Sequence, residues 1–175
     1  KIKELPEQRD ISEEEPRVGV FVCNCGINIG GIVDVPAVRE YARNLPNVVH
    51  VEDNLFTCSQ DTQVHMAEVI KEKGINRMLV AACTPHTHED LFRETLLEVG
   101  LNKYLFEMAN IRNQDSWVHM SDPDKATAKA KDLVRMSVAR AALLEPLEER
   151  MIEIKQRGLV IGGGVAGLNA ALNLG

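Results

Sequence analysis

The sequence predicts an α/β protein built on a mostly parallel sheet, and three observations carry this prediction. From Arg17 onward, short apolar runs of strand length alternate with amphipathic segments of helix length, as they do where crossover helices join parallel strands. Glycine and proline stand at many of the boundaries between these segments, where helices end and turns begin. The chain of 175 residues is 45% hydrophobic, enough to bury one ordinary core with flanking pieces.

Four apolar runs are expected to form the strands of this sheet. Each run has the length of a strand and is bounded by turn signals. The runs comprise residues 18–22, 48–56, 78–82 and 104–106.

Three helices are expected between these strands. Residues that can cap free backbone amides precede each helix, and glycine or proline follows it. The expected caps are Asp34, Ser59 or Asp61, and Thr84 with Pro85, and the expected ends are Pro46, Gly74 and Gly100. The expected buried faces are Val35, Val38, Ala42 and Leu45, then Val64, Ala67 and Ile70, then Phe92, Leu96 and Val99.

The last helix of the domain is expected to be the longest. Residues 121–124 resemble a capping box, and the helical pattern continues to about Glu145. Its core-facing residues are expected to be Leu133, Val134, Val138 and Ala141. We therefore divide the chain into a charged, solvated tail at 1–16, one α/β domain at 17–146, a connector at 147–157 and the start of a second domain at 158–175.

All four cysteines fall where predicted strands end. Cys23 and Cys25 follow the first strand, Cys58 the second and Cys83 the third. The carboxyl ends of parallel strands meet at one edge, where open α/β sheets bind their ligands. Neighbouring strands lie ~4.8 Å apart, so four thiolates on loops there can surround one compact metal cluster. The amino ends of the crossover helices point to the same edge and favour negative charge.

These cysteines predict an iron-sulfur site, and three other interpretations stay open. A structural zinc site usually presents two close C-x2-4-C pairs, whereas 32 residues separate Cys25 from Cys58 and 24 separate Cys58 from Cys83. A redox disulfide between Cys23 and Cys25 would close a small, strained ring. The third alternative is that the cysteines are small buried hydrophobes that share one edge by coincidence.

Two histidines and one tryptophan are weaker candidates for the site. His86 and His88 stand close to Cys83 and could ligate a metal, but histidines in a first helical turn are more often exposed. Trp117 and the neighbouring His119 are expected to pack or to face solvent.

A glycine-rich turn near the end of the chain predicts a dinucleotide site. Residues 159–161 are expected to form a short buried strand that leads into GGGVAG and an Ala/Leu-rich helix, the required context for G-x-G-x-x-G. Gly162 would allow the tight turn, Gly164 the approach of a pyrophosphate, and Gly167 close packing of helix on strand. The turn does not distinguish FAD from NAD, and a packing motif without a ligand is the alternative. We expect the chain alone to bind a flavin weakly or not at all.

Composition argues against other classes of protein. The net charge is -6, basic residues are scattered and only 4% of residues are aromatic, unlike a nucleic-acid-binding surface. No apolar run approaches the roughly 18 residues of a membrane-spanning helix, and the charged first residues do not resemble a signal peptide. We expect a soluble, cytoplasmic protein, in which cysteines are more often ligands or redox thiols than disulfides. Because the chain begins with Lys and stops inside a predicted helix, we expect a piece of a longer protein.

Several stretches of the sequence resemble the A subunit of heterodisulfide reductase. They are RVGVFVCNCGINIGG, FTCS, VAACTPHTHE, YLFEMANIR with SWVHM, KATAKAKDLVRMSVARAALLEPLE and LVIGGGVAGLNAALNLG. The likeness covers nearly everything from Arg17 to Gly175. It implies a Rossmann-like iron-sulfur domain, followed by the first strand, turn and helix of a thioredoxin-reductase-like, FAD-binding domain.

The resemblance also implies a role for each group of residues. The ligands of a 4Fe-4S cluster would be Cys23, Cys25, Cys58 and Cys83, and the residues at the FAD pyrophosphate would be Gly162, Gly164 and Gly167. The implied protein is a larger FAD and iron-sulfur oxidoreductase that works with other subunits and electron carriers, as a homodimer within a larger complex.

We therefore expect an electron-transfer module without a catalytic residue of its own. Two other functions stay open. One is a zinc-stabilised or metal-free domain that docks partner subunits onto a flavoprotein. The other is a dinucleotide-binding reductase domain whose thiols are incidental.

Overall fold

The computed structural model describes residues 5–174, and its sheet has four strands, all parallel. The strands are β1 (Val18–Cys23), β2 (Val48–Asn54), β3 (Arg77–Ala82) and β4 (Phe106–Asn110). They lie in the order β2-β1-β3-β4. Both central strands are buried along their whole length, as their continuous apolar runs require. The predicted Rossmann-like α/β fold is confirmed.

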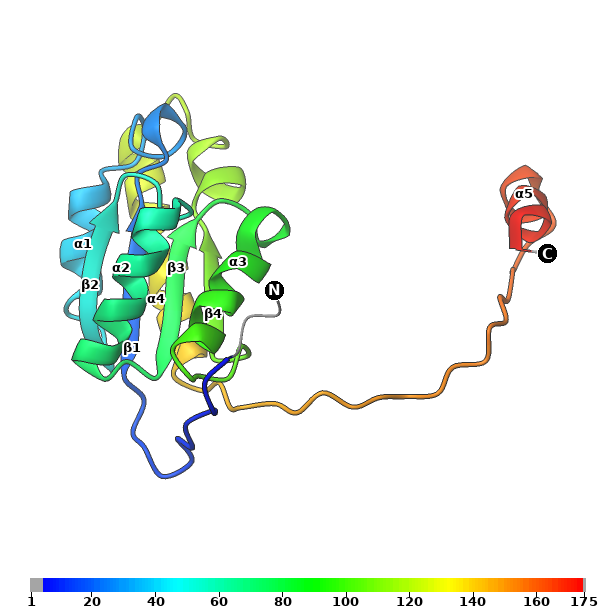
Figure 1. The fold of residues 1–175 in the computed structure, drawn as a ribbon. Coiled ribbons are helices and arrows are strands. Elements are labelled where there is room, and N and C mark those ends of the chain that lie inside the picture. Colours follow the sequence, from blue (N-terminus) through cyan, green and yellow to red (C-terminus); the bar gives the residue numbers. More distant parts are fainter. Residues whose placement is uncertain (1–4, 175) are drawn as a thin grey trace.

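Helices cover both faces of the sheet (Figure 1). On one face α1 (Val35–Ala42) packs against α4 (Pro123–Ala141), and on the other α2 (Gln60–Lys73) packs against α3 (Pro85–Glu98). Two of the three expected caps form side-chain hydrogen bonds, since Asp34 accepts one from the Ala37 amide and Ser59 one from the Thr62 amide. Gly74 ends α2 in the left-handed conformation, with φ 59°.

Two strands differ from their predicted bounds. β4 begins where the prediction ends, because Glu107 lies inside it and interrupts the apolar pattern. Glu107 is only 9% exposed, and its carboxylate accepts a hydrogen bond from Arg140 at 3.2 Å. β2 stops at Asn54, and the apolar Leu55 and Phe56 beyond it are exposed.

Two helices also differ from the prediction. α2 buries Met66, Val69 and Ile70, whereas Val64 is exposed. Both this face and the predicted one fit a helical period, so periodicity alone could not choose between them. α4 ends at Ala141, about one turn before Glu145.

Residues 5–16 are mostly exposed, as their charge predicts, but the segment is anchored to the domain. It forms no helix or strand, but Ile11 is 1% exposed and belongs to the core. The Arg9 amide donates a hydrogen bond to the Gly100 carbonyl at 2.7 Å. Asn76, at the start of β3, donates to the Glu15 carbonyl at 3.0 Å. The segment thus packs along the amino edge of the sheet.

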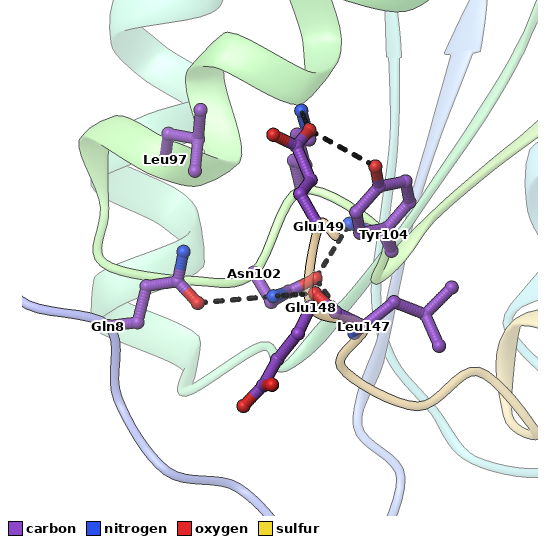
Figure 2. A pocket seen from close by; sticks show the side chains of 8 residues that line it. Gln8, Leu97, Asn102, Tyr104, Leu147, Glu148 and Glu149 are labelled. Carbon is purple, nitrogen blue, oxygen red and sulfur yellow. Dashed lines mark hydrogen bonds and ion pairs between the residues drawn. The ribbon is translucent and has the colours of Figure 1, made fainter. Parts of the chain in front are cut away.

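The same edge holds a polar hollow of about 540 Å³ between α3, the loop before β4 and the segment after α4 (Figure 2). Asn102 occupies its centre and is 9% exposed. Its side chain donates to Gln8 Oε1 and to the Leu147 carbonyl, and accepts from the Tyr104 and Leu147 amides. The hollow therefore ties both ends of the domain together, on the side away from the cysteines.

After Glu149, which still contacts Lys103, the chain leaves the domain as an extended segment that ends in α5 (Val165–Leu174) (Figure 1). The strand predicted at 159–161 is absent, and Leu159 and Ile161 are exposed. A strand exists only through hydrogen bonds to a neighbouring strand, and no described segment pairs with this one. None of the helices in residues 5–174 is long and apolar enough to cross a membrane.

Candidate metal centre

Two of the four cysteines flank the point where the strand order of the sheet reverses. The chain passes outward from β1 to β2 and then back across to β3. Open α/β sheets bind ligands at such a switch point, outside the carboxyl ends of the two strands. Cys23 is the last residue of β1 and Cys83 follows the last residue of β3. They are 4% and 7% exposed, respectively.

Cys25 lies in a tight turn directly after β1. Its φ of 44° and ψ of 40° place it in the left-handed region, which is uncommon for a residue other than glycine. The following Gly26 also has a positive φ, of 53°. Burial is the main cause that raises the pKa of Cys23 and of Cys83, and negative charge on neighbouring thiols adds to the rise: that of Cys25 at Cys23, and those of Cys23 and Cys25 at Cys83. Cys23, Cys25 and Cys83 therefore lie at one edge of the sheet, within reach of each other's charge.

Cys58 follows β2 and lies at the same edge. It lines a hollow between α2 and α3, beside Gln60 and Leu91. The preceding residue touches the site, because the Thr57 amide donates to Cys23 Sγ at 3.4 Å. Among residues 5–174, no three His, Cys, Asp or Glu side chains are arranged around a single metal ion.

Burial and nearby polar or charged groups have opposite effects on the pKa values of the two buried thiols. Burial raises the pKa of Cys23, and hydrogen bonds from Thr57 oppose that rise. Burial also raises the pKa of Cys83, and the positive charge of Arg112 opposes it. Buried thiols of this kind stay protonated unless a positive charge or a metal compensates the thiolate.

The amino ends of helices face the same edge. α2 begins two residues after Cys58 and α3 two residues after Cys83, so their free amides and dipoles favour an anion there. Thr84, the N-cap of α3, makes no side-chain capping bond. His86 is exposed and His88 half-buried in the first turn of α3, and neither belongs to a metal-binding group in the described part of the chain.

Two of the three glycines in the glycine-rich turn have a conformation or a close contact that favours glycine. Gly162 has a φ of 109°, which favours glycine strongly. A Cβ at Gly167 would lie 2.0 Å from the Gly162 carbonyl oxygen, so the close approach of turn and helix requires glycine there. Nothing lies within 4 Å of a Cβ built at Gly164, which leaves its backbone accessible.

A segment after β4 also borders the edge, and the sequence did not single it out. It is the π-helix η2 (Arg112–Ser116), a rare conformation that is frequent at functional sites. The Ser116 hydroxyl donates to the Asn28 carbonyl at 2.6 Å, and the Trp117 indole donates to Asn28 Oδ1 at 3.4 Å. Trp117 therefore both packs and remains 45% exposed, and it is the lone tryptophan of the chain.

Asp115 in η2 is the second feature that the sequence did not reveal. The residue is fully buried, and neither carboxylate oxygen has a hydrogen-bond partner among the described residues. Burial raises its pKa to about 6, and Lys129 on α4 opposes the rise. In the sequence it stands in the polar run Arg112-Asn113-Gln114-Asp115, which is typical of an exposed loop.

The fold and the site together define a class, that of Rossmann-like α/β domains with a thiol-lined ligand edge. No family model matches the chain. It is 57% identical over 168 residues to the A subunit of H(2):CoB-CoM heterodisulfide,ferredoxin reductase from Methanothermobacter thermautotrophicus, covering 96% of this chain and 26% of that protein. It is 55% identical over 164 residues to the second iron-sulfur A subunit of CoB--CoM heterodisulfide reductase from Methanopyrus kandleri, covering 94% and 25%.

A third relative, the A subunit of ferredoxin:CoB-CoM heterodisulfide reductase from Methanosarcina mazei, is 48% identical over 158 residues, covering 90% of this chain and 20% of that protein. Over the residues that it spans, the chain is similar along almost its whole length to these heterodisulfide reductase A subunits. It spans about a quarter of the length of these relatives or less.

Proposed function

We propose that this chain is an electron-transfer module of a heterodisulfide-reductase-type iron-sulfur flavoprotein. The ligands of its 4Fe-4S cluster are Cys23, Cys25, Cys58 and Cys83. The observation that supports the proposal most strongly is that all four cysteines follow strands of one parallel sheet and so lie at its carboxyl edge. The Thr57 amide, next to Cys58, donates a hydrogen bond to Cys23 Sγ. The name of the Methanopyrus kandleri relative, which calls it an iron-sulfur protein, supports it.

A bound cluster supplies reversible uptake and release of single electrons. The chain contributes ligation, insulation and position. Cys23 and Cys83 lie among buried apolar residues, which keeps water from their sulfurs. The Thr57 amide donates to Cys23 Sγ, and amide hydrogen bonds to sulfur are one means of tuning a potential. No residue of the chain is required to make or break a covalent bond of a substrate.

The position of Cys58 is compatible with a cluster. The four thiolates of a 4Fe-4S cluster bind different iron atoms, whereas zinc ligands must all lie about 2.3 Å from one ion. Rotation of the Cys58 side chain about its Cα–Cβ bond moves the sulfur while its backbone, next to Thr57, stays at the edge. We expect cluster binding to turn this side chain from the hollow between α2 and α3 towards Cys23.

The second part of the proposal concerns FAD. Gly162, Gly164 and Gly167 would contact its pyrophosphate, the open space at Gly164 and the start of α5 being suited to an anion. We place the chain in a cytoplasmic complex with other subunits and electron carriers, as a homodimer. The relatives' names, which include ferredoxin and a heterodisulfide, support a ferredoxin-like donor or acceptor.

A second candidate function is a zinc-stabilised or metal-free domain that docks partner subunits. One observation favours it. Exposed large apolar side chains gather in the loops at the carboxyl edge, as expected of a docking surface. They are Ile27, Leu55, Phe56, Val118 and Met120.

Iron and sulfide analysis of the chain purified without oxygen tests the proposal. We expect about four iron and four sulfide atoms per chain, with a brown colour. Cys58→Ser and Cys83→Ser should lose most of both, whereas Val64→Ala, an exposed substitution on α2, should not. A colourless protein that holds zinc or no metal, and whose iron content does not respond to these substitutions, would support the docking function instead.

A further inference from the structure

Arg112 brings a positive charge to the cysteine edge. The Ile111 amide donates to the Ala82 carbonyl at 2.9 Å, so β3 and β4 end at the same level. Cys83 directly follows β3 and Arg112 stands two residues after β4, so both residues lie at the same edge, beyond the ends of neighbouring strands.

This charge has no acidic partner. In residues 5–174 Arg112 forms no ion pair, unlike Arg39, which pairs with Asp53 at 2.7 Å. The Arg112 Nε donates to Asn113 Oδ1 at 3.2 Å, and no described residue accepts a hydrogen bond from its two terminal nitrogens. A cation beside a thiol-lined edge, without a counter-ion, is expected where the chain binds an anionic group.

The arginine is held in place by the lone tryptophan. The Arg112 guanidinium lies over the Trp117 ring, 4.7 Å from its centroid, within the range of a cation–π interaction. The Trp117 indole donates to Asn28, and the Asn28 amide donates to the Cys25 carbonyl at 3.1 Å. This chain of contacts connects the segment beside Cys83 to the turn that carries Cys25.

We propose that Arg112, positioned by Trp117, raises the reduction potential of the group that the four cysteines bind. This inference rests on the proposed function. Four thiolates make a cluster anionic, and each added electron increases its negative charge. A fixed positive charge stabilises the reduced state more than the oxidised state, because the attraction grows with the charge of its partner. Arg112 thus favours acceptance of an electron at this edge.

The test is the midpoint potential of Arg112 variants by anaerobic redox titration. Arg112→Met removes the charge and should weaken electron affinity about tenfold, which is about 59 mV for one electron. Arg112→Lys keeps the charge and should restore most of the potential. Trp117→Leu should lower the potential less than Arg112→Met, because the charge stays but is no longer fixed. Arg135→Met, at an exposed arginine on α4 that pairs with Asp132, should leave it unchanged.

Iron content and unfolding midpoint of each variant separate the possible failures. A wild-type chain without iron overturns the proposed function, and the inference with it. An Arg112→Met chain that holds iron with an unchanged potential overturns the inference alone. If Arg112→Met folds but loses its iron, retention of iron by Arg112→Lys supports a role of the charge. Loss of iron in both variants overturns the inference that the charge of Arg112 acts on the bound group.

Discussion

Two buried polar side chains flank β4, and they differ in whether they are hydrogen-bonded. Asn102 precedes the strand at the amino edge, and its side chain makes four hydrogen bonds (Figure 2). Asp115 follows the strand at the carboxyl edge and has no hydrogen-bond partner among the described residues. The first loop satisfies the rule that buried polar groups are paired, and the second segment does not.

The backbone shows the same difference. At the amino edge, the residues with positive φ are Asn47, Gly74 and Gly100, types that tolerate the left-handed region. At the carboxyl edge, Cys25 adopts it with a φ of 44°. Natural proteins break local rules mainly at functional sites. The paired polar groups of the amino edge favour stability, whereas the carboxyl edge contains backbone strain and an unpaired polar side chain, as the proposed ligand site predicts.

The largest effect is expected from Asn102→Ala. This change removes four hydrogen bonds that join the amino-terminal segment, the loop before β4 and the segment after α4. The free energy of unfolding should fall by about 3 kcal/mol, measured by urea denaturation, with iron content unchanged. Asn173→Ala, at an exposed position of α5, should have little effect. A loss of less than about 1 kcal/mol in Asn102→Ala would contradict a structural role for this edge.

Asp115→Asn is expected to have a smaller effect, and to raise the free energy of unfolding rather than lower it. Burial raises the pKa of Asp115 from 3.8 to about 6, so between these values the folded chain holds a proton that the unfolded chain has released. Its contribution to stability therefore falls as the pH rises through this window. At about pH 7.5 the amide should stabilise the chain by about 2 kcal/mol, and at about pH 4 it should change little.

Urea denaturation of both chains at the two pH values checks this prediction. Lys129 is the charged group that opposes the shift from α4, so Lys129→Met should raise the pKa further and increase the cost at the higher pH. Equal effects of Asp115→Asn at both pH values would show that the carboxyl group has partners in solution.

Much of the fold could be predicted because its signals are local. The apolar runs and caps identified four strands and four helices, and Asp34, Ser59 and Gly74 act as their types predict. The errors arose where tertiary contacts decide. Ile11 is buried although its segment is charged, and Glu107 lies inside β4 because Arg140 pairs with it.

The site could be predicted only in part. Each cysteine follows a predicted strand, and this was enough to predict a common edge, because the carboxyl ends of parallel strands meet at one edge of the sheet. The orientation of Cys58 was not predictable, since one side-chain rotation decides whether it faces the thiols or the α2–α3 hollow. The role of the π-helix was also hidden, because Arg112 and Trp117 meet through a conformation that has no sequence signature.

Cys25→Gly is expected to have the smallest effect on stability and to separate fold from function at one position. Glycine adopts the left-handed conformation without steric cost, and this gain outweighs the greater freedom of the unfolded chain. The metal-free chain should therefore gain up to about 1 kcal/mol in urea denaturation, while its iron content after anaerobic reconstitution should fall. Gly26→Ala, in the next left-handed position, should lose about as much stability. A destabilised Cys25→Gly chain would mean that the thiol contributes packing, and that the strain at Cys25 does not reflect ligand binding.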